Sequence, residues 1–354
     1  MNISIIGYYG SNFGDLLMLK ALVENLEKST IKILTYGSKA HLLEQAFITD
    51  KSIDVIELNS AKKLEILQTI KNTNTIIWGG GTCFMDEGGT GGIKYMILAK
   101  LLGSRVYYAG IGADNHNKPY TKLCMLVATI ISNTIYARDY DSIKALKKIN
   151  PFAAKKIIKT PDLAYASNVG ASNKDKDKDK DKDKDKYLIF CPRNLEQYKS
   201  LPYDTNRKLI EVASRTANEL GLRKIIVLNA DPIVDQHTSN QAAHYFQSSG
   251  FESEIINGDD LEKCSYSLSN CEFLLTIRLH PAVIALENSI PFAIFNYSEK
   301  NRKFAEESDT LERLIHQDGI DNFRPLYTLA KRSPKKCMRA ETIQHIRKLS
   351  PGSN

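Results

Sequence analysis

The stretch Phe273-Leu274-Leu275-Thr276-Ile277-Arg278-Leu279-His280-Pro281 combines a buried strand with the start of a helix. Residues 273–277 are apolar except for one threonine, which is typical of a strand covered on both faces. Pro281 then opens an apolar helical run, because proline is favoured at the first helical position, where its missing N–H costs nothing. Arg278 and His280 are therefore expected at the carboxyl end of a strand, beside a helix N-terminus.

This placement predicts a binding or catalytic role. In open α/β sheets ligands bind at the carboxyl edge, and helix N-termini attract anions. Arg278 offers a planar fork for a carboxylate or a phosphate, and His280 is suited to proton transfer near neutral pH. The alternative is an arginine and a histidine that stand together in a loop by chance.

The alternation of strand and helix repeats along the chain and predicts parallel βαβ units. The expected strands cover residues 3–6, 31–34, 53–56, 75–78, 105–112 and 134–137, then 187–191, 224–229, 253–256, 273–277 and 291–295. The predicted fold class is α/β, with two Rossmann-like domains that face a cleft in a GT-B-like arrangement.

Four segments are expected from the composition. They are an N-terminal Rossmann-like domain (1–168), a loop (169–186), a C-terminal Rossmann-like domain (187–332) and a C-terminal helix and tail (333–354). The loop contains the strict Lys-Asp alternation 174–186, which has no apolar residue to bury and is expected to be disordered.

Composition limits the classes of function. The 354 residues are 42% hydrophobic, and 48 Lys and Arg against 41 Asp and Glu give a net charge of +7. This excess suits an anionic small substrate or an acidic membrane surface and is too dispersed for nucleic acid. The six cysteines lack zinc spacing, so buried thiols in a reducing compartment and no metal site are expected. Neither a signal-peptide pattern nor a membrane-length apolar run is present, which favours a cytoplasmic location.

Glycine-rich turns follow several of the expected strands. The first, Gly7–Asp15, lacks the G-x-G-x-x-G spacing of a nicotinamide site. Gly79, Gly80 and Gly81 end another strand and would let a ligand approach the backbone closely. A bare tight turn is the alternative for these three glycines.

The order of the motifs resembles the polysaccharide pyruvyl transferase family over nearly the whole chain. The motifs are Gly10–Asp15, Gly79–Gly81 with Asp86, Gly110–Gly112, Arg138-Asp139 with Ser142, Pro161–Ala164, Arg278–His280, and Tyr297 with Lys300. Two departures stand out. Cys83-Phe84-Met85 replaces the more usual Leu and Gln before Asp86, and the Lys-Asp alternation is foreign to the family pattern.

The resemblance implies phosphoenolpyruvate as donor, a glycan hydroxyl pair as acceptor and a pyruvate ketal as product in surface polysaccharide biosynthesis, without a cofactor. A donor with a carboxylate and a phosphate needs cations that do not titrate. Arg138, Arg193 and Arg278 each follow an expected strand and are the predicted donor-binding cations, together with Gly79–Gly81.

His280 is the expected acid that protonates the donor methylene, with Arg278 and Asp15 as further catalytic candidates. The helix N-terminus favours a neutral imidazole, whereas a bound anionic donor favours its protonated form. The expected acceptor-binding residues are Asn12, Asp86, Asp139 and Lys300. For two carboxylates a structural role is the alternative, since Asp15 would cap its helix and Asp139 would pair with Arg138.

Two other classes of function stay open at this point. One is a GT-B glycosyltransferase that uses a nucleotide sugar, and the other is a non-catalytic glycan-binding protein. The sequence names neither the acceptor sugar nor an oligomeric state, so a homo-oligomer stays open. If the acceptor is lipid-linked, Lys331, Arg332, Lys335 and Lys336 would contact anionic lipid at the inner face of the membrane.

Overall fold

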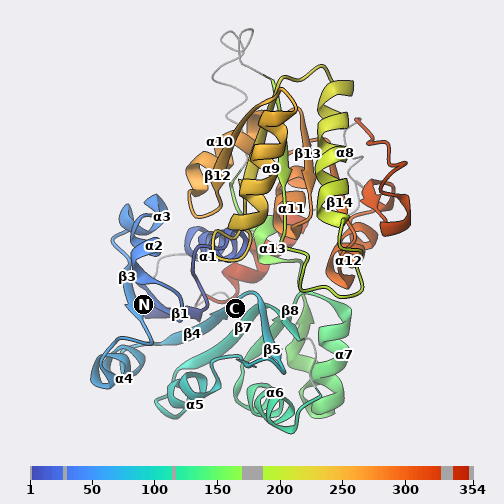
Figure 1. Cartoon of the computed structure of the whole chain (residues 1–354). Helices are drawn as coiled ribbons and strands as arrows, with labels where there is room; N and C mark the ends of the chain where they lie inside the picture. Colours follow the sequence, from blue (N-terminus) through green and yellow to red (C-terminus); the bar gives the residue numbers. More distant parts are fainter. Residues whose placement is uncertain (1, 27–29, 114–116, 170–185, 328–337, 351–354) are drawn as a thin grey trace. The chain divides into compact units, whose positions relative to one another are not determined.

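The computed structural model describes residues 2–26, 30–113, 117–169, 186–327 and 338–350 (Figure 1). The chain forms two compact units. Unit 1 comprises residues 1–10, 15–167 and 337–354, and unit 2 comprises residues 11–14 and 168–336. Each unit contains a parallel sheet with helices on both faces. Nearly all of the Lys-Asp alternation, and the basic residues 331, 332, 335 and 336, lie outside the described residues.

The sheet of unit 1 has the strand order of a Rossmann fold, β3-β2-β1-β4-β7, continued by β8 and β9. The paired strands are parallel. They are β1 (Asn2–Gly7), β2 (Thr30–Thr35), β3 (Asp54–Glu57), β4 (Thr75–Gly79), β7 (Arg105–Ala113), β8 (Thr134–Ala137) and β9 (Ile157–Lys159).

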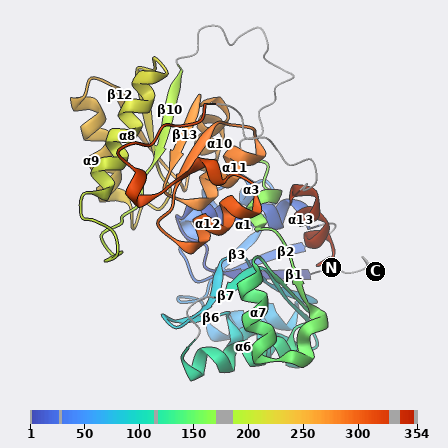
Figure 2. The ribbon, with the colours of Figure 1, turned by 90° about the vertical axis from the view of Figure 1, so that its right-hand side faces the viewer.

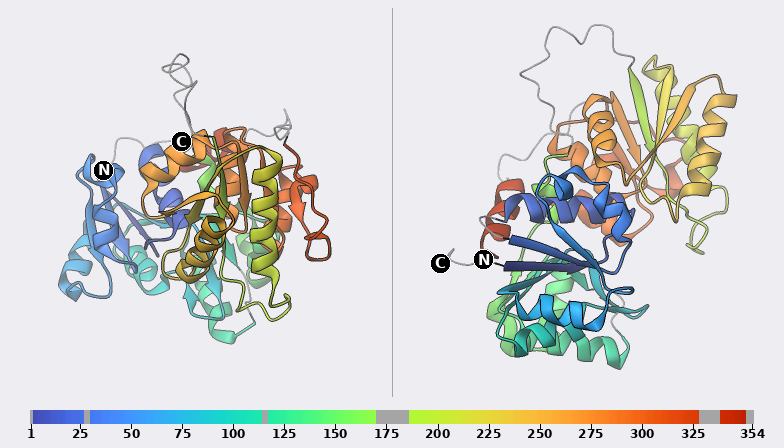
Figure 3. Two further views of the ribbon diagram at one scale, coloured as in Figure 1. Left: turned by 45° about the horizontal axis from the view of Figure 1, so that its top comes forward. Right: turned by 90° about the vertical axis from the view of Figure 1, so that its left-hand side faces the viewer.

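Helices cover both faces of this sheet. Figures 2 and 3 show α4 (Lys63–Lys71), α5 (Ile93–Leu101), α6 (Pro119–Ile131) and α7 (Tyr140–Ile149) on one face, and α1 (Phe13–Asn25) on the other. With both faces covered, the central strand β4 is buried at every position. This burial explains why its sequence is apolar after Thr75 instead of alternating.

The glycine-rich region after β4 is more regular than its sequence suggests. β5 (Thr82–Met85) pairs with β6 (Gly89–Thr90) as an antiparallel hairpin. β5 also pairs in parallel with the carboxyl end of β7. Cys83 and Phe84 are buried, and this tertiary packing fixes a strand where composition alone indicates only a loop.

The C-terminal helix α13 (Met338–Arg347) belongs to unit 1, although the sequence sets residues 333–354 apart as a separate segment. The ring of His345 lies 4.9 Å from that of Tyr136, and its Nδ1 is 3.0 Å from the Thr160 hydroxyl oxygen. These long-range contacts, which no local pattern predicts, join the end of the chain to β8.

The sheet of unit 2 repeats the Rossmann order as β12-β11-β10-β13-β14-β15, with every pair parallel. Its strands are β10 (Tyr187–Cys191), β11 (Lys224–Asn229), β12 (Glu252–Asn257), β13 (Phe273–Thr276), β14 (Phe292–Phe295) and β15 (Leu314–Ile315). Figures 1 and 2 show α8 (Thr205–Glu219) and α9 (Gln236–Ser248) on one face, with α10 (Leu261–Asn270) and α11 (Leu279–Glu287) on the other.

Strand order reverses between β10 and β13, and such a switch point is where open α/β sheets bind ligands. The helix after β13 begins at Leu279 with Arg278 as its N-cap, two residues before the expected start at Pro281. The first four N–H groups of a helix have no partner within it, so proline is tolerated throughout the first turn. His280 is consequently part of the helix.

The five cysteines of the described chain are buried and free. Burial raises the pKa of the Cys191 and Cys271 thiols to about 12, which makes both unreactive at neutral pH. Within the described residues, no helix is both long and apolar enough to cross a membrane, and no cluster of His, Cys, Asp and Glu has the make-up of a metal site.

Candidate functional site

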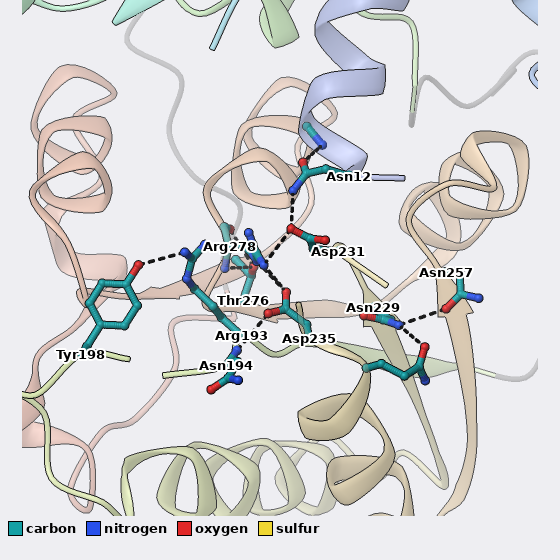
Figure 4. Close-up of polar contacts among 12 residues, drawn as sticks. Asn12, Arg193, Asn194, Tyr198, Asn229, Asp231, Asp235, Asn257, Thr276 and Arg278 are labelled. Carbon is teal, nitrogen blue, oxygen red and sulfur yellow. Dashed lines mark hydrogen bonds and ion pairs between the residues drawn. The ribbon is translucent and has the colours of Figure 1, made fainter. Parts of the chain in front are cut away.

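A polar cluster occupies the carboxyl edge of the unit 2 sheet at the switch point (Figure 4). Arg193 follows β10, Asp231 and Asp235 follow β11, and Arg278 follows β13. Because these three parallel strands are neighbours in the order β11-β10-β13, their carboxyl ends bring four charged side chains together.

Arg278 is held by both aspartates. Its Nε donates to Asp235 Oδ2 at 2.7 Å, its Nη2 pairs with the same oxygen, and Nη2 lies 3.4 Å from Asp231 Oδ2. The Thr276 hydroxyl fixes the turn by accepting from the Arg278 N–H at 3.0 Å. Burial lowers the pKa of the guanidinium, but the two carboxylates more than offset this, so the pKa lies above its usual value.

Asp235 is the more deeply buried of the two aspartates, with a side chain that is 0% exposed. Its Oδ1 accepts from the Asn194 N–H at 2.9 Å, so both carboxylate oxygens have partners. Burial raises the pKa of Asp235, and the charge of Arg278 offsets part of the rise. Asp235 therefore orients Arg278 and compensates its charge.

Arg193 contacts two tyrosines, Tyr198 and Tyr297, whose rings also contact each other. Its Nη2 donates to the Tyr198 hydroxyl at 2.8 Å, and its guanidinium carbon lies 4.8 Å from the centre of the Tyr297 ring. Its buried Nε has no hydrogen-bond partner among the described residues, and no carboxylate there lies within ion-pair distance. In contrast to Arg278, Arg193 therefore has a charge that no carboxylate at ion-pair distance in the described chain compensates.

A cavity of about 310 Å³ lies beside Tyr198, in the segment between β10 and α8. Its lining mixes aromatic, aliphatic and polar side chains: Leu195, Glu196, Tyr198, Lys199, Leu201, Pro202, Tyr203, Thr205 and Asn206. This size is near the lower end of ligand pockets, and a mixed lining is typical of them. The cavity shares Tyr198 with the tyrosine pair around Arg193.

Asn12 connects residues 11–14 to this cluster. Its Oδ1 accepts from the Gly14 N–H at 2.9 Å, the bond of a helix N-cap, and its Nδ2 donates to Asp231 Oδ2 at 3.0 Å. Asn12, not Asp15, is thus the residue that caps α1. Asp15 is the third residue of that helix, where its charge favours the N-terminal end of the helix dipole.

The His280 imidazole lies directly against Gly14. A Cβ atom at residue 14 would stand only 1.9 Å from His280 Nδ1. Both residues belong to unit 2, and each is in the first turn of a helix, α1 for Gly14 and α11 for His280. The glycine is required here because any side chain would occupy the space of the imidazole.

Gly14→Ala is therefore expected to displace His280 and lower turnover by at least 10-fold. Alanine is a better helix former than glycine by about 1 kcal/mol, so the helix itself should not be weakened. Gly10→Ala is a matched control, because its Cβ would meet atoms of Tyr8 at an ordinary 3.6 Å. Steady-state kinetics on both variants tests this, and an unimpaired Gly14→Ala enzyme would show that the position of His280 is not critical.

Arg138 in unit 1 is also enclosed by its own unit. Its Nη2 donates to the Thr82 hydroxyl at 2.8 Å, its Nη1 lies 3.4 Å from Asp162 Oδ2, and its Nε lies 3.8 Å from Asp139 Oδ2. Asp139 caps α7 by accepting from the Ser142 N–H at 2.7 Å. The expected pairing of Asp139 with Arg138 thus occurs in the structure, and the helix cap is an additional role.

The three glycines after β4 differ in their surroundings. A Cβ at Gly79 would meet Tyr9 Oη at 2.2 Å, and one at Gly80 would meet Met18 Sδ at 2.6 Å. Gly81 has a φ of +75°, and nothing lies within 4 Å of its Cβ position. Packing thus explains Gly79 and Gly80, whereas Gly81 has open space for a close approach to its backbone.

The two other expected acceptor residues are Asp86, in the turn between β5 and β6, and Lys300. Asp86 accepts from the N–H groups of Asn117 at 2.8 Å and Lys118 at 3.1 Å, just before α6. Desolvation raises the pKa of Asp86. These two bonds and one from Thr121 together lower the pKa by more than desolvation raises it, so the net shift is downward. Lys300 is exposed in the first turn of α12 (Glu299–Glu307) of unit 2.

Each unit brings some of the expected site residues together. Unit 2 joins Asn12 and Arg278 in one hydrogen-bond network through Asp231 and brings Arg193 to the same sheet edge, with His280 two residues from Arg278. Unit 1 contains Arg138 and Asp139 in contact, together with Asp15, Asp86 and Gly79–Gly81. Sequence reasoning missed Asp231, Asp235 and Tyr198. Asp231 follows a strand by two residues, as Arg193 and Arg278 do, and that spacing was the available signal.

Solved structures of sugar-nucleotide enzymes share this fold. UDP-GlcNAc 2-epimerase from Methanocaldococcus jannaschii has a TM-score of 0.62 at 13% identity and covers 99% of both chains. The Neisseria meningitidis enzyme bound to UDP-GlcNAc has a TM-score of 0.58 at 13% identity, over 91% of this chain and 90% of that one. Identity this low establishes the fold alone. It confirms the prediction of an α/β chain with two Rossmann-like domains of the GT-B class.

No curated protein sequence matches the chain significantly. The family model described as polysaccharide pyruvyl transferase matches residues 12–299. That range begins at Asn12, which caps α1, and includes Arg193, Asp231, Asp235 and the Arg278–His280 motif. The match spans most of the chain and contains the whole polar cluster of unit 2, so the protein belongs to the polysaccharide pyruvyl transferase family.

Proposed function

We propose that this protein transfers a pyruvyl group from phosphoenolpyruvate to a pair of glycan hydroxyls and forms a pyruvate ketal in surface polysaccharide biosynthesis. The observation that carries this proposal is the pairing of the family match with Arg193 and Arg278 at the switch point of one sheet (Figure 4), where His280 stands in the first turn of the helix that follows. The carboxylate and phosphate of the donor need permanent cations, and its methylene carbon needs an acid.

The two arginines bind the donor in different ways. Arg193 keeps an uncompensated charge and an unused Nε donor, so it supplies most of the attraction for the anion. Arg278 is neutralised by Asp231 and Asp235, but its Nη1 donates to neither carboxylate in the structure. Its contribution is a fixed, directional hydrogen-bond donor more than net charge.

The reaction then follows from proton transfer at His280. Protonation of the donor methylene gives a cationic C2, which a glycan hydroxyl attacks. The phosphate leaves with the electron pair of its C2–O bond, and the second hydroxyl closes the ketal. One phosphate is released for each ketal, and the glycan gains a carboxylate.

Thermal unfolding with different ligands tests the choice of donor. A ligand that binds only the folded state stabilises it, by about 2.7 kcal/mol at 100 times its Kd. Phosphoenolpyruvate should raise the melting temperature, whereas UDP-GlcNAc at the same concentration should not. Protection by the nucleotide sugar alone would favour a glycosyltransferase and contradict phosphoenolpyruvate as donor.

Arg193→Lys is expected to weaken phosphoenolpyruvate binding by at least 10-fold. Lysine keeps the charge but loses the planar fork and its contacts with the rings of Tyr198 and Tyr297. Titration calorimetry gives the affinity, and Arg207→Lys, an exposed arginine of α8 in the same unit, is the matched control. Unchanged affinity in Arg193→Lys would place the donor anion elsewhere.

A further inference from the structure

Asp231 presents one open carboxylate oxygen at the centre of the polar cluster. Its Oδ2 accepts from Asn12 Nδ2 at 3.0 Å and pairs with Arg278 Nη2 at 3.4 Å. Its Oδ1 has no hydrogen-bond partner among the described residues, and the side chain is 15% exposed. The two partners of Oδ2 hold the carboxylate in place and leave Oδ1 available for a further hydrogen bond (Figure 4).

The neighbouring carboxylate lacks this freedom. Asp235 is completely buried, with Oδ1 bound by the Asn194 N–H and Oδ2 by Arg278. In unit 1, Asp86 and Asp139 each accept from backbone N–H groups at a helix start. Those bonds give both carboxylates a structural role at the start of a helix. Within the polar cluster of unit 2, Asp231 alone combines a fixed position with an available oxygen.

We propose that Asp231 is the base that takes the proton from the attacking acceptor hydroxyl. This inference rests on the proposed function, because the family match and the resemblance supply no residue for that role. Aspartate is ionised at neutral pH, and a carboxylate within hydrogen-bond reach of a hydroxyl is a standard general base. Asn12 and Arg278 act as positioning residues through their bonds to Oδ2.

The step balances with His280 as the acid. His280 gives its proton to C3 of the donor, and the acceptor oxygen bonds to C2 as its own proton passes to Asp231 Oδ1. Phosphate departs with the electron pair of the C2–O bond. The second hydroxyl then bonds to C2, and its proton leaves with the phosphate. The proton on Asp231 returns to His280 through solvent, so both groups are restored.

Asp231→Asn tests this role. Asparagine has nearly the same shape, and its side-chain oxygen can still accept from Asn12 and Arg278, so folding and donor affinity should persist. The kcat for ketal formation should fall by about 100-fold or more, the usual scale for a lost general base, while the calorimetric Kd for phosphoenolpyruvate stays within about threefold. Asp318→Asn, an exposed aspartate of unit 2, is the matched control and should behave like the unaltered protein.

Asp231→Ala provides an independent measurement, because it leaves space for an external carboxylate. Added formate should raise the activity of Asp231→Ala by at least 10-fold. It should not change the activity of Asp318→Asn. Normal turnover in Asp231→Asn would overturn the role of Asp231 as base. A loss of donor affinity that matches the loss of kcat, without rescue by formate, would also overturn it and leave Asp231 as a support for Arg278.

Ketal formation by the unaltered protein distinguishes a failure of this inference from a failure of the proposed function on which it rests. If it forms a ketal from phosphoenolpyruvate while Asp231→Asn is equally active, only the base assignment fails. If the unaltered protein forms no ketal with any glycan, the proposed function and the role of Asp231 fail together.

Discussion

His280→Gln should lower turnover by about 100-fold or more while phosphoenolpyruvate still binds. Glutamine keeps a polar side chain of similar reach but cannot donate and recover a proton at neutral pH, and a lost general acid typically costs this much. The measurements are phosphate release in the presence of an acceptor glycan and the calorimetric Kd of the donor.

His237→Gln is the matched control for this experiment. His237 is an exposed residue of α9 in the same unit, so its replacement should leave both measurements unchanged. A His280→Gln enzyme with normal turnover would make His280 structural. The acid would then have to be sought among Asp15 and Asp86.

Asp235→Ala should destabilise unit 2 by about 3–5 kcal/mol, the usual cost of removing one partner of a buried ion pair. The change leaves the largely buried Arg278 without the carboxylate oxygen that its Nε and Nη2 both contact, and it also removes the acceptor for the Asn194 N–H. Urea denaturation followed by circular dichroism measures the effect. Asp235→Asn should lose less stability than Asp235→Ala, because the asparagine side-chain oxygen can still accept hydrogen bonds.

The exposed Asp318 again provides the control, because surface substitutions usually change stability by less than about 0.5 kcal/mol. If Asp235→Ala were destabilised by less than about 1 kcal/mol, the ion pair with Arg278 would not be a structural element. The orientation of Arg278 would then need another explanation.

Most strands of both sheets could be predicted because they are short apolar runs followed by polar residues or glycine, whereas β5, β6, β9 and β15 were not expected. Residues 273–277 illustrate this, since the observed β13 ends one residue earlier, at Thr276. The division of the chain could not be predicted from local patterns. Ser11–Gly14 belongs to unit 2 because the Phe13 N–H donates to the Ala230 carbonyl oxygen at 2.8 Å. Contacts so distant in sequence leave no periodic signal.

Part of the site could be predicted from local sequence patterns, as the strands could. Arg193, Arg278 and His280 were found because they follow strands, and parallel strands bring their carboxyl ends together. The partners of these residues depend on tertiary distances. Asp235 is the clearest case, because it lies six residues beyond the end of β11 and reaches Arg278 through the fold alone.

The most direct measurement is the fate of the donor carbon. The protein would be incubated with phosphoenolpyruvate labelled with ¹³C at C2 and with glycan extracted from cells that lack the protein, and the product examined by NMR and mass spectrometry. We predict a labelled ketal carbon on the glycan and one released phosphate for each ketal. Glycan that stays unlabelled with phosphoenolpyruvate, but gains a sugar when a nucleotide sugar is supplied, would contradict the account.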